Sequence, residues 1–289
     1  MTPPHGRTRV RPPRSALLAA ALVALALPSA ASADDAGSAT ASSGAVQATL
    51  TWKAAELGAA DPHLVVVRAG ATLFDGSPVA SSESCREGGC SFAPSGKREG
   101  PLQVRDLNGD GEPEVLVDVY SGGAHCCALT ELLSFTGSGY ATREVEWGNN
   151  GYDLRDLDAD GRPEFVGSDD AFAGAFSSFA ASFFPPRVLG YDPAAKDGFR
   201  DVTRRFPKLV RSNVRVALRA LRRARRQQRE TIGIVAAYVA DLYLLGRGRE
   251  VRPYLARARK RGDLRGIAGP ASLRYERQLL AFLRKQGYR

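Results

Sequence analysis

Two short stretches of the sequence place oxygen-bearing side chains at alternate positions. The first is DLNGDGEPE, from Asp106, and the second is DLDADGRPE, from Asp156, fifty residues later. Side-chain oxygens at positions 1, 3 and 5 of a tightly wound loop converge on one point, glycine at position 6 allows the reversal, and the carbonyl oxygen of position 7 then turns inward. Hard oxygen ligands at this density favour Ca²⁺, which takes six to eight oxygens at roughly 2.3–2.6 Å. The two stretches therefore predict two loops that bind Ca²⁺ as a cofactor.

The same residue types are also common in ordinary hydrogen-bonded turns between strands. Two copies of one pattern favour metal binding, because carboxylates so close together would repel one another without a cation. The loops are not EF-hands, since position 12, a bidentate Glu in an EF-hand, is Val117 in the first loop and Gly167 in the second. The acid lies at position 9 instead, as Glu114 and Glu164, and each loop leads into an apolar strand.

This pattern resembles the calcium-loop repeats of the FG-GAP/VCBS class, which occur in integrin-type β-propellers and in many secreted bacterial proteins. The resemblance covers about residues 100–200. It is carried by Asp106, Asn108, Asp110, Gly111, Glu114, Asp156, Asp158, Asp160, Gly161 and Glu164. It implies that each loop joins two strands of a blade and binds Ca²⁺ through the side chains at positions 1, 3, 5 and 9. It also implies carbonyl ligands at position 7, which are Glu112 and Arg162 here.

The same resemblance implies a binding or structural role at the cell envelope rather than catalysis. The sequence contains no G-x-S-x-G, Walker A, G-x-G-x-x-G or H-E-x-x-H motif. Its closely paired carboxylates lie mainly inside the two loops, so no acid/base pair of the glycosidase type can be assigned. An enzyme is therefore the less favoured interpretation.

A second constellation, Ser121 to Cys127, follows the strand after the first loop. His125 with Cys126 and Cys127 could hold a soft metal or form a Cys–His nucleophile, which gives the alternative of an extracytoplasmic metal- or thiol-dependent enzyme. The favoured interpretation is a glycine-rich turn with a hydrogen-bonded histidine and disulfide cysteines. We expect a Cys85–Cys90 disulfide, whereas Cys126 and Cys127 can pair with each other, pair separately or stay free.

The positions of these residues require mainly β structure with helices after it. The β-rich domain is expected over residues 46–200, with six strand-like runs at 46–52, 64–67, 71–74, 114–120, 129–135 and 187–191. Two loop repeats in about 150 residues cannot close a seven-bladed ring at roughly fifty residues per blade, so we expect a partial or irregular propeller-like domain. One helix is expected inside it, ended by Pro185-Pro186, from phenylalanines at spacings of 4, 3 and 4: Phe172, Phe176, Phe179 and Phe183.

From residue 201 to residue 289 the apolar residues recur at helical spacing. The expected helices carry an apolar face from 210 to 224 and cover 232–245, 251–260 and 271–284. This all-α C-terminal domain has 24 basic and 6 acidic residues, whereas residues 34–200 have 12 basic and 25 acidic residues. Its arginine run is a solvated helix face, a surface that docks on the acidic β domain, or a site for an anionic partner. The run consists of Arg219, Arg222, Arg223, Arg225, Arg226 and Arg229.

The N-terminal residues 1–33 predict a secretory signal peptide. Four arginines precede an apolar run over 16–27, and Ala31-Ser32-Ala33 provides a cleavage site near Ala33–Asp34. We therefore expect a secreted protein with no transmembrane segment after cleavage and a flexible leader over 34–45. Its expected partners are an anionic cell-envelope polymer, a polysaccharide or another surface protein, and nucleic acid is not expected.

Overall fold

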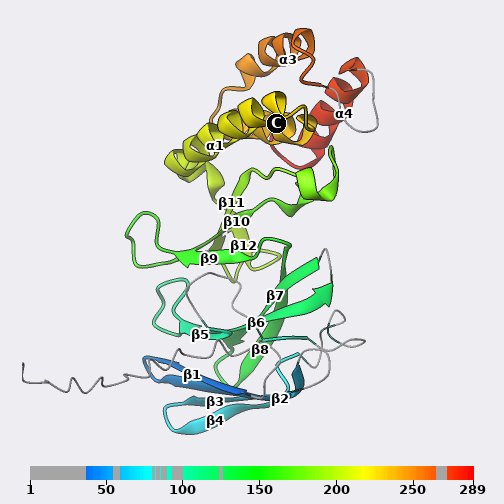
Figure 1. Cartoon of the computed structure of the whole chain (residues 1–289). Helices are drawn as coiled ribbons and strands as arrows, with labels where there is room; N and C mark the ends of the chain where they lie inside the picture. The colour runs from blue at the N-terminus through cyan, green and yellow to red at the C-terminus, as the bar shows by residue number, and fades with distance from the viewer. Residues whose placement is uncertain are drawn as a thin grey trace, which may run out of the picture. The chain divides into compact units, whose positions relative to one another are not determined.

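The computed structural model describes residues 37–54, 59–79, 82, 85, 90–92, 100–123, 126–264 and 272–289 of the 289-residue chain (Figure 1). These residues belong to one compact unit, Ala33–Arg289. The strands come first along the chain and the α-helices last, so a mainly β protein with a helical C-terminus is confirmed. The predicted signal peptide lies outside the described residues, and the predicted boundary at residue 200 stays a prediction.

The strands form three four-stranded sheets, and each sheet pairs its strands antiparallel in chain order. Sheet 1 contains β1 (Gly37–Ser43), β2 (Val46–Ala54), β3 (Ala59–Arg68) and β4 (Ala71–Gly76). Sheet 2 contains β5 (Leu102–Arg105), β6 (Glu114–Gly123), β7 (Cys126–Phe135) and β8 (Tyr140–Gly148). Sheet 3 contains β9 (Tyr152–Arg155), β10 (Glu164–Ser168), β11 (Pro186–Tyr191) and β12 (Phe199–Asp201). In the described part of the chain the three sheets do not close into a propeller ring.

Sheet 2 is apolar on both faces, which explains the nearly continuous apolar run of β6. Val115 and Val117 lie in a core that includes Leu50 and Leu64 of sheet 1. Leu116, which points the opposite way, lies in a second core with residues of sheet 3 such as Phe165. A strand covered on both faces needs apolar residues at successive positions rather than alternate ones.

The four predicted α-helices are confirmed as α1 (Pro207–Arg226), α2 (Ile232–Leu244), α3 (Val251–Lys260) and α4 (Ser272–Lys285). Ten of the thirteen residues of α2 are buried, so this helix is apolar all round and forms the centre of the helical core. No helix among the described residues is both long and apolar enough to cross a bilayer.

The predicted flexible leader over residues 34–45 is wrong in part. Residues 37–43 of the predicted flexible leader form strand β1, which pairs along its whole length with β2. The two-residue turn at Gly44-Ala45, where Gly44 has a φ of +55°, closes this hairpin, and Ala39 and Ala41 pack against the core. Small polar composition is therefore compatible with a strand when a neighbouring apolar strand supplies the pairing.

The phenylalanine stripe does not form the predicted helix. The segment has two short 3₁₀ turns, Asp170–Phe172 and Phe179–Ala181, because the chain becomes extended at Ala173 and Gly174 has a φ of +63°. The stripe still packs into the helical core, where the ring centroid of Phe172 lies 5.0 Å from that of Phe282.

This packing predicts that the segment before β11 stabilises the helices. Phe172→Ala should destabilise the protein by about 3–5 kcal/mol, the usual range for a buried phenylalanine. Leu273→Ala on α4, where the side chain is 56% exposed, is the control and should change stability by less than about 0.5 kcal/mol. Both values come from urea unfolding. A loss below about 1 kcal/mol for Phe172→Ala would show that this segment is not part of the core.

Candidate metal centre

The two acidic loops occupy the same place in two different sheets. The first loop joins β5 to β6 and the second joins β9 to β10, so each connects the first and second strands of its sheet. The last strand pair before each loop is also equivalent, Arg105 opposite Glu114 and Arg155 opposite Glu164. In sheet 1 the corresponding connection is the turn at Gly44-Ala45, which has no acidic residue. The two copies of the sequence repeat thus occupy equivalent positions in sheets 2 and 3.

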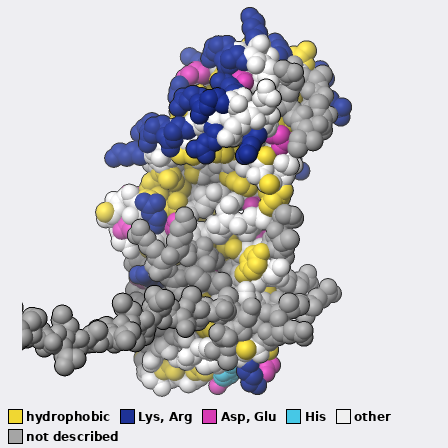
Figure 2. Space-filling model, in the orientation of Figure 1, with side chains coloured by type: hydrophobic (Ala, Val, Ile, Leu, Met, Phe, Trp, Pro, Cys, Tyr) yellow, Lys and Arg dark blue, Asp and Glu magenta, His cyan; other side chains and the backbone are white. Residues whose placement is uncertain are grey.

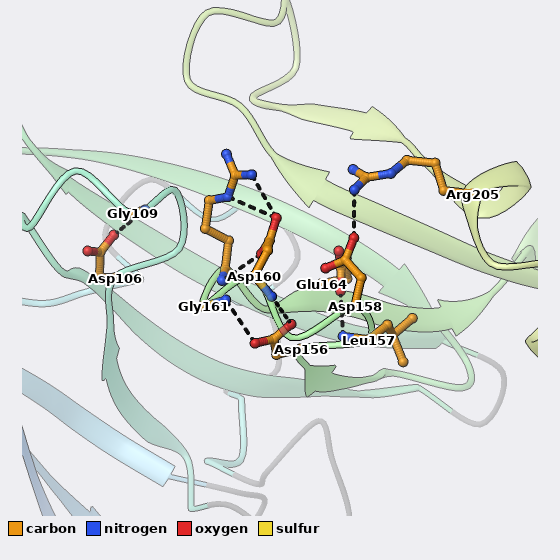
Figure 3. Close-up of polar contacts among 10 residues, drawn as sticks. Asp106, Gly109, Asp156, Leu157, Asp158, Asp160, Gly161, Glu164 and Arg205 are labelled. Carbon is orange, nitrogen blue, oxygen red and sulfur yellow. Dashed lines mark hydrogen bonds and ion pairs between the residues drawn. The ribbon is translucent and has the colours of Figure 1, made fainter.

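In the second loop the acidic side chains fix the backbone (Figure 3). The Gly161 N–H donates to Asp156 Oδ2 at 2.9 Å, and the Arg162 N–H donates to Asp160 Oδ1 at 2.9 Å. The Leu157 N–H donates to Glu164 Oε2, also at 2.9 Å. Positions 1, 5 and 9 therefore accept hydrogen bonds from positions 6, 7 and 2.

The first loop makes the same three hydrogen bonds. The acceptors Asp106 Oδ2, Asp110 Oδ1 and Glu114 Oε2 take N–H groups of positions 6, 7 and 2 at 2.9, 2.8 and 3.1 Å. The position 6 glycines also agree, with φ of +86° at Gly111 and +85° at Gly161. Only glycine adopts this conformation without strain, so the two loops share one conformation that the sequence pattern requires.

The second loop brings three carboxylates together. Asp156, Asp158 and Glu164 each offer an oxygen, and these atoms lie within 4.8 Å of one another. The first loop has Asn108 at position 3, so its corresponding set has two carboxylates and one amide. The Asn108 side chain is bonded within the loop, donating to Asp110 Oδ2 at 2.9 Å and accepting the Asp110 N–H at 3.1 Å. Convergence on one point is therefore clearest in the second loop.

Two arginines, one distant in the chain and one within the second loop, compensate part of the negative charge. Arg205, 47 residues from Asp158, donates to Asp158 Oδ2 at 2.6 Å (Figure 3). Arg162 donates to Asp160 Oδ2 at 2.7 Å and lowers the pKa of Asp160. The sequence patterns did not identify Arg205, because nothing local links it to the loop.

The predicted position 7 ligands, the carbonyl oxygens of Glu112 and Arg162, stay predictions. Their side chains are both in ion pairs, Arg162 with Asp160 and Glu112 with Arg68 at the end of β3. Arg68 also lies over the Phe135 ring, 4.5 Å from its centroid. Arg68 therefore connects the first loop to sheet 1 and to the end of β7. Sequence analysis did not identify this contact either, because 44 residues separate the two partners.

The position 9 glutamates are both 4% exposed. Burial raises the pKa of Glu114 to about 7, and the nearby carboxylates of Asp110 and Asp106 add to the increase. Burial likewise raises the pKa of Glu164, with Asp158 and Asp160 contributing. A divalent cation would reverse these effects by favouring the ionised form. The donor set of carboxylates and carbonyls fits Ca²⁺ rather than a soft metal.

The two loops are neighbours in space. A cleft of about 300 Å³ is lined by Asn108 of the first loop, by Asp160, Arg162 and Glu164 of the second, and by Arg205. A side-chain carbon at Gly109 would lie 3.3 Å from the side chain of Arg162. The two sites that the sequence predicted fifty residues apart therefore belong to one region.

The cysteine predictions are confirmed in part. Cys85 and Cys90 form a disulfide with a Cα–Cα distance of 5.3 Å. Cys127 is also disulfide-bonded, so it offers no thiol for the alternative of a Cys–His enzyme. His125 and the side chain of Cys126 lie outside the described residues.

Comparison with known proteins gives two partial similarities. Over 161 residues the chain is 35% identical to a probable thylakoid lumen protein of Synechocystis sp., covering 50% of this chain and 44% of that protein. Over 75 residues it is 32% identical to a protein of Sinorhizobium fredii described as uncharacterized, covering 26% of this chain and 12% of that protein. The chain spans less than half the length of these relatives. No family model and no solved structure matches it.

The raised pKa of Glu114 predicts a pH-dependent stability in the absence of calcium. A carboxyl whose pKa rises from 4.5 to about 7 on folding stabilises the folded state below pH 4.5, and this contribution is lost as the pH rises through 7. The loss is on the order of 3 kcal/mol. Glu114→Gln, which keeps an oxygen for the Leu107 N–H, should remove that part of the decline between pH 5 and pH 7.5.

Urea unfolding in a chelator at both pH values measures the difference. Asp197→Asn, an exposed site in the turn between β11 and β12, is the control and should keep the wild-type decline. If Glu114→Gln declines as much as the wild type, the buried carboxyl is not the titrating group.

Proposed function

We propose that this chain is an extracytoplasmic Ca²⁺-binding protein of the FG-GAP/VCBS-like kind, with a binding or structural role at the cell envelope. The observation that carries the proposal is the equivalence of the two loops, in sequence, backbone hydrogen bonds and position in the sheet. An ordinary turn needs no such repetition, and its carboxylates need not converge. The three convergent carboxylates of the second loop support the metal-binding interpretation over the turn.

Two observations support the extracytoplasmic part of the proposal. The Synechocystis relative is described as a probable thylakoid lumen protein, and the thylakoid lumen is not a cytoplasmic compartment. The Cys85–Cys90 disulfide is of the kind that persists in oxidising compartments. Both agree with the signal peptide that residues 1–33 predict.

The residues of the second loop that would hold the ion are Asp156, Asp158 and Glu164, with the carbonyl of Arg162. When bound, Ca²⁺ supplies positive charge to carboxylates that otherwise repel. Asp156 directly follows β9, and Glu164 is the first residue of β10. Holding both residues at one point would therefore fix the first strand pair of sheet 3, and the first loop would do the same for β5 and β6.

The proposal predicts that calcium stabilises the folded protein. At 1 mM calcium and a dissociation constant of ~10 µM, each site adds about 2.7 kcal/mol to the free energy of unfolding. The melting temperature should rise by on the order of 10 °C with both sites filled. Asp158→Ala should remove about half of this calcium-dependent rise, because it removes the position 3 ligand of one site, whereas Asn at this position is what the first loop already has in Asn108.

The measurement compares thermal unfolding in 1 mM calcium with unfolding in excess chelator. Asp197→Asn again provides a charge-matched control and should show the full rise. A wild-type melting temperature that is the same in calcium and in chelator contradicts the proposal.

Arg205 competes with a cation for Asp158, which gives a second prediction. Without calcium its guanidinium lies 2.6 Å from Asp158 Oδ2, at a partly exposed position. Exposed ion pairs are worth about 0.2–1 kcal/mol, so Arg205→Gln should raise calcium affinity at the second loop by up to about fivefold. Isothermal titration calorimetry measures the change.

Arg200→Gln is the matched control, because Arg200 lines the same cleft but pairs with Asp192. Arg200→Gln should change the free energy of calcium binding by less than about half as much as Arg205→Gln does. An unchanged or lower affinity in Arg205→Gln would show that Asp158 is not a ligand.

A further inference from the structure

Helix α1 carries a row of cations along the face opposite its buried residues. We call this the basic row, and it consists of Lys208, Arg211, Arg215, Arg219, Arg222 and Arg226. The spacings of 3, 4, 4, 3 and 4 residues place all six on one side of the helix, over about 27 Å. All six are exposed, whereas Val210, Ala217, Leu221 and Ala224 on the other side are buried. Figure 2 shows Lys and Arg side chains gathered over the helical elements.

The fold does not use the basic row for its own stability. Among the described residues the row has no ion pair, and α1 contains no acidic residue. The arginines that do stabilise the fold lie off the row. Arg225 pairs with the buried Asp263 at 2.6 Å, and Arg204 donates to the Tyr243 carbonyl at 2.6 Å.

The row opposes helix formation in two ways. Like charges three and four residues apart repel on a helix, and Lys208 lies at the positive end of the helix dipole. Because the six side chains are exposed, the row also does not dock on the acidic β region of the described chain. A row that weakens its own helix and pairs with no carboxylate of the described residues is suited to an anionic partner from outside.

The geometry favours a linear polymer over a membrane. Ala217, Leu221 and Ala224 of α1 lie in the helical core, and Val216, 40% exposed, is an isolated apolar side chain on the helix surface, so α1 has no continuous free apolar face to insert into a bilayer. Five of the six cations are arginines, whose planar guanidinium groups bind phosphate through two parallel hydrogen bonds. Neighbouring cations rise by about 4.5–6 Å along the helix axis. A polyol phosphate chain carries one charge in every short repeat, so successive phosphates can meet successive cations of the row.

We propose that the basic row binds a linear envelope polymer whose repeats are joined by phosphodiester groups. The proposal rests on the extracytoplasmic part of the proposed function and not on calcium binding.

The test uses the full chain and a poly(glycerol phosphate) polymer as the probe, with binding measured by calorimetry at several salt concentrations. Arg211→Gln, Arg219→Gln and Arg226→Gln combined should lower affinity at least tenfold at 50 mM salt. Counterion release gives a slope of about −0.7 per neutralised phosphate for a flexible chain, so the triple variant should also reduce the salt slope by about 2. Circular dichroism confirms that each variant is folded.

Arg252→Gln, Arg277→Gln and Arg284→Gln combined form the matched control, because these exposed arginines lie on α3 and α4 and change the net charge equally. This control should lower affinity less than threefold. Equal losses in the two triple variants would overturn the proposal, because binding would then depend on net charge alone.

Two further arms test the identity of the partner. Tighter binding to phosphatidylglycerol vesicles, or to single-stranded DNA of equal phosphate content, would overturn the assignment to an envelope polymer. All arms are run with calcium and with chelator. If the loops bind no calcium, the row should still bind the polymer. The two proposals can therefore fail independently of each other.

Discussion

Three carboxylate oxygens within 4.8 Å of one another repel unless positive charge lies close by. The residues around the second loop must therefore stabilise these crowded negative charges. The side chains of Asp156, Asp160 and Glu164 accept backbone N–H groups, which holds the loop in its tight conformation. Arg162 and Arg205 supply positive charge from the side. The remaining negative charge, including that of the buried Glu164, is what a divalent cation would neutralise.

The three sheets share one topology but differ in the connection that follows their first strand. Each sheet is an antiparallel meander of four strands in chain order. Sheets 2 and 3 have an acidic loop after their first strand, and sheet 1 has a two-residue turn there. Arg68 at the end of β3 donates to Glu112 of the first loop. Sheet 1, which has no acidic loop, therefore supplies an arginine to the loop of sheet 2. The loops therefore depend on residues from outside their own sheets, as Arg205 shows for the second loop.

The sequence predicted features that depend on local pattern. The four α-helices follow from apolar spacing, and the Cys85–Cys90 disulfide follows from a short glycine-rich turn. The loop conformation follows from the positions of Asp and Gly, because the side chain of each acid bonds a backbone group two to seven residues away. These interactions join residues that are close in sequence, so a local sequence pattern is enough to predict them.

Features that depend on tertiary contacts were not predictable in this way. Strand β1 contains only small and polar residues, and its pairing with β2 determines its conformation. The segment with Phe172 has helical spacing, but its rings are placed by contacts with Phe282 and Tyr288, more than one hundred residues later. Strand β8 is mostly exposed and has no clear alternation, which is why sequence patterns did not indicate it. Arg68 and Arg205 were not identified for the same reason, since their partners are distant in sequence.

The central claim is that two equivalent loops each hold one calcium ion. Equilibrium dialysis of the chelator-treated full chain against calcium at pH 7.5 tests this claim most directly, because it counts ions without depending on stability. We expect two calcium ions bound per chain, and one per chain in Asp158→Ala. Calcium in the protein compartment no higher than in the buffer would contradict it.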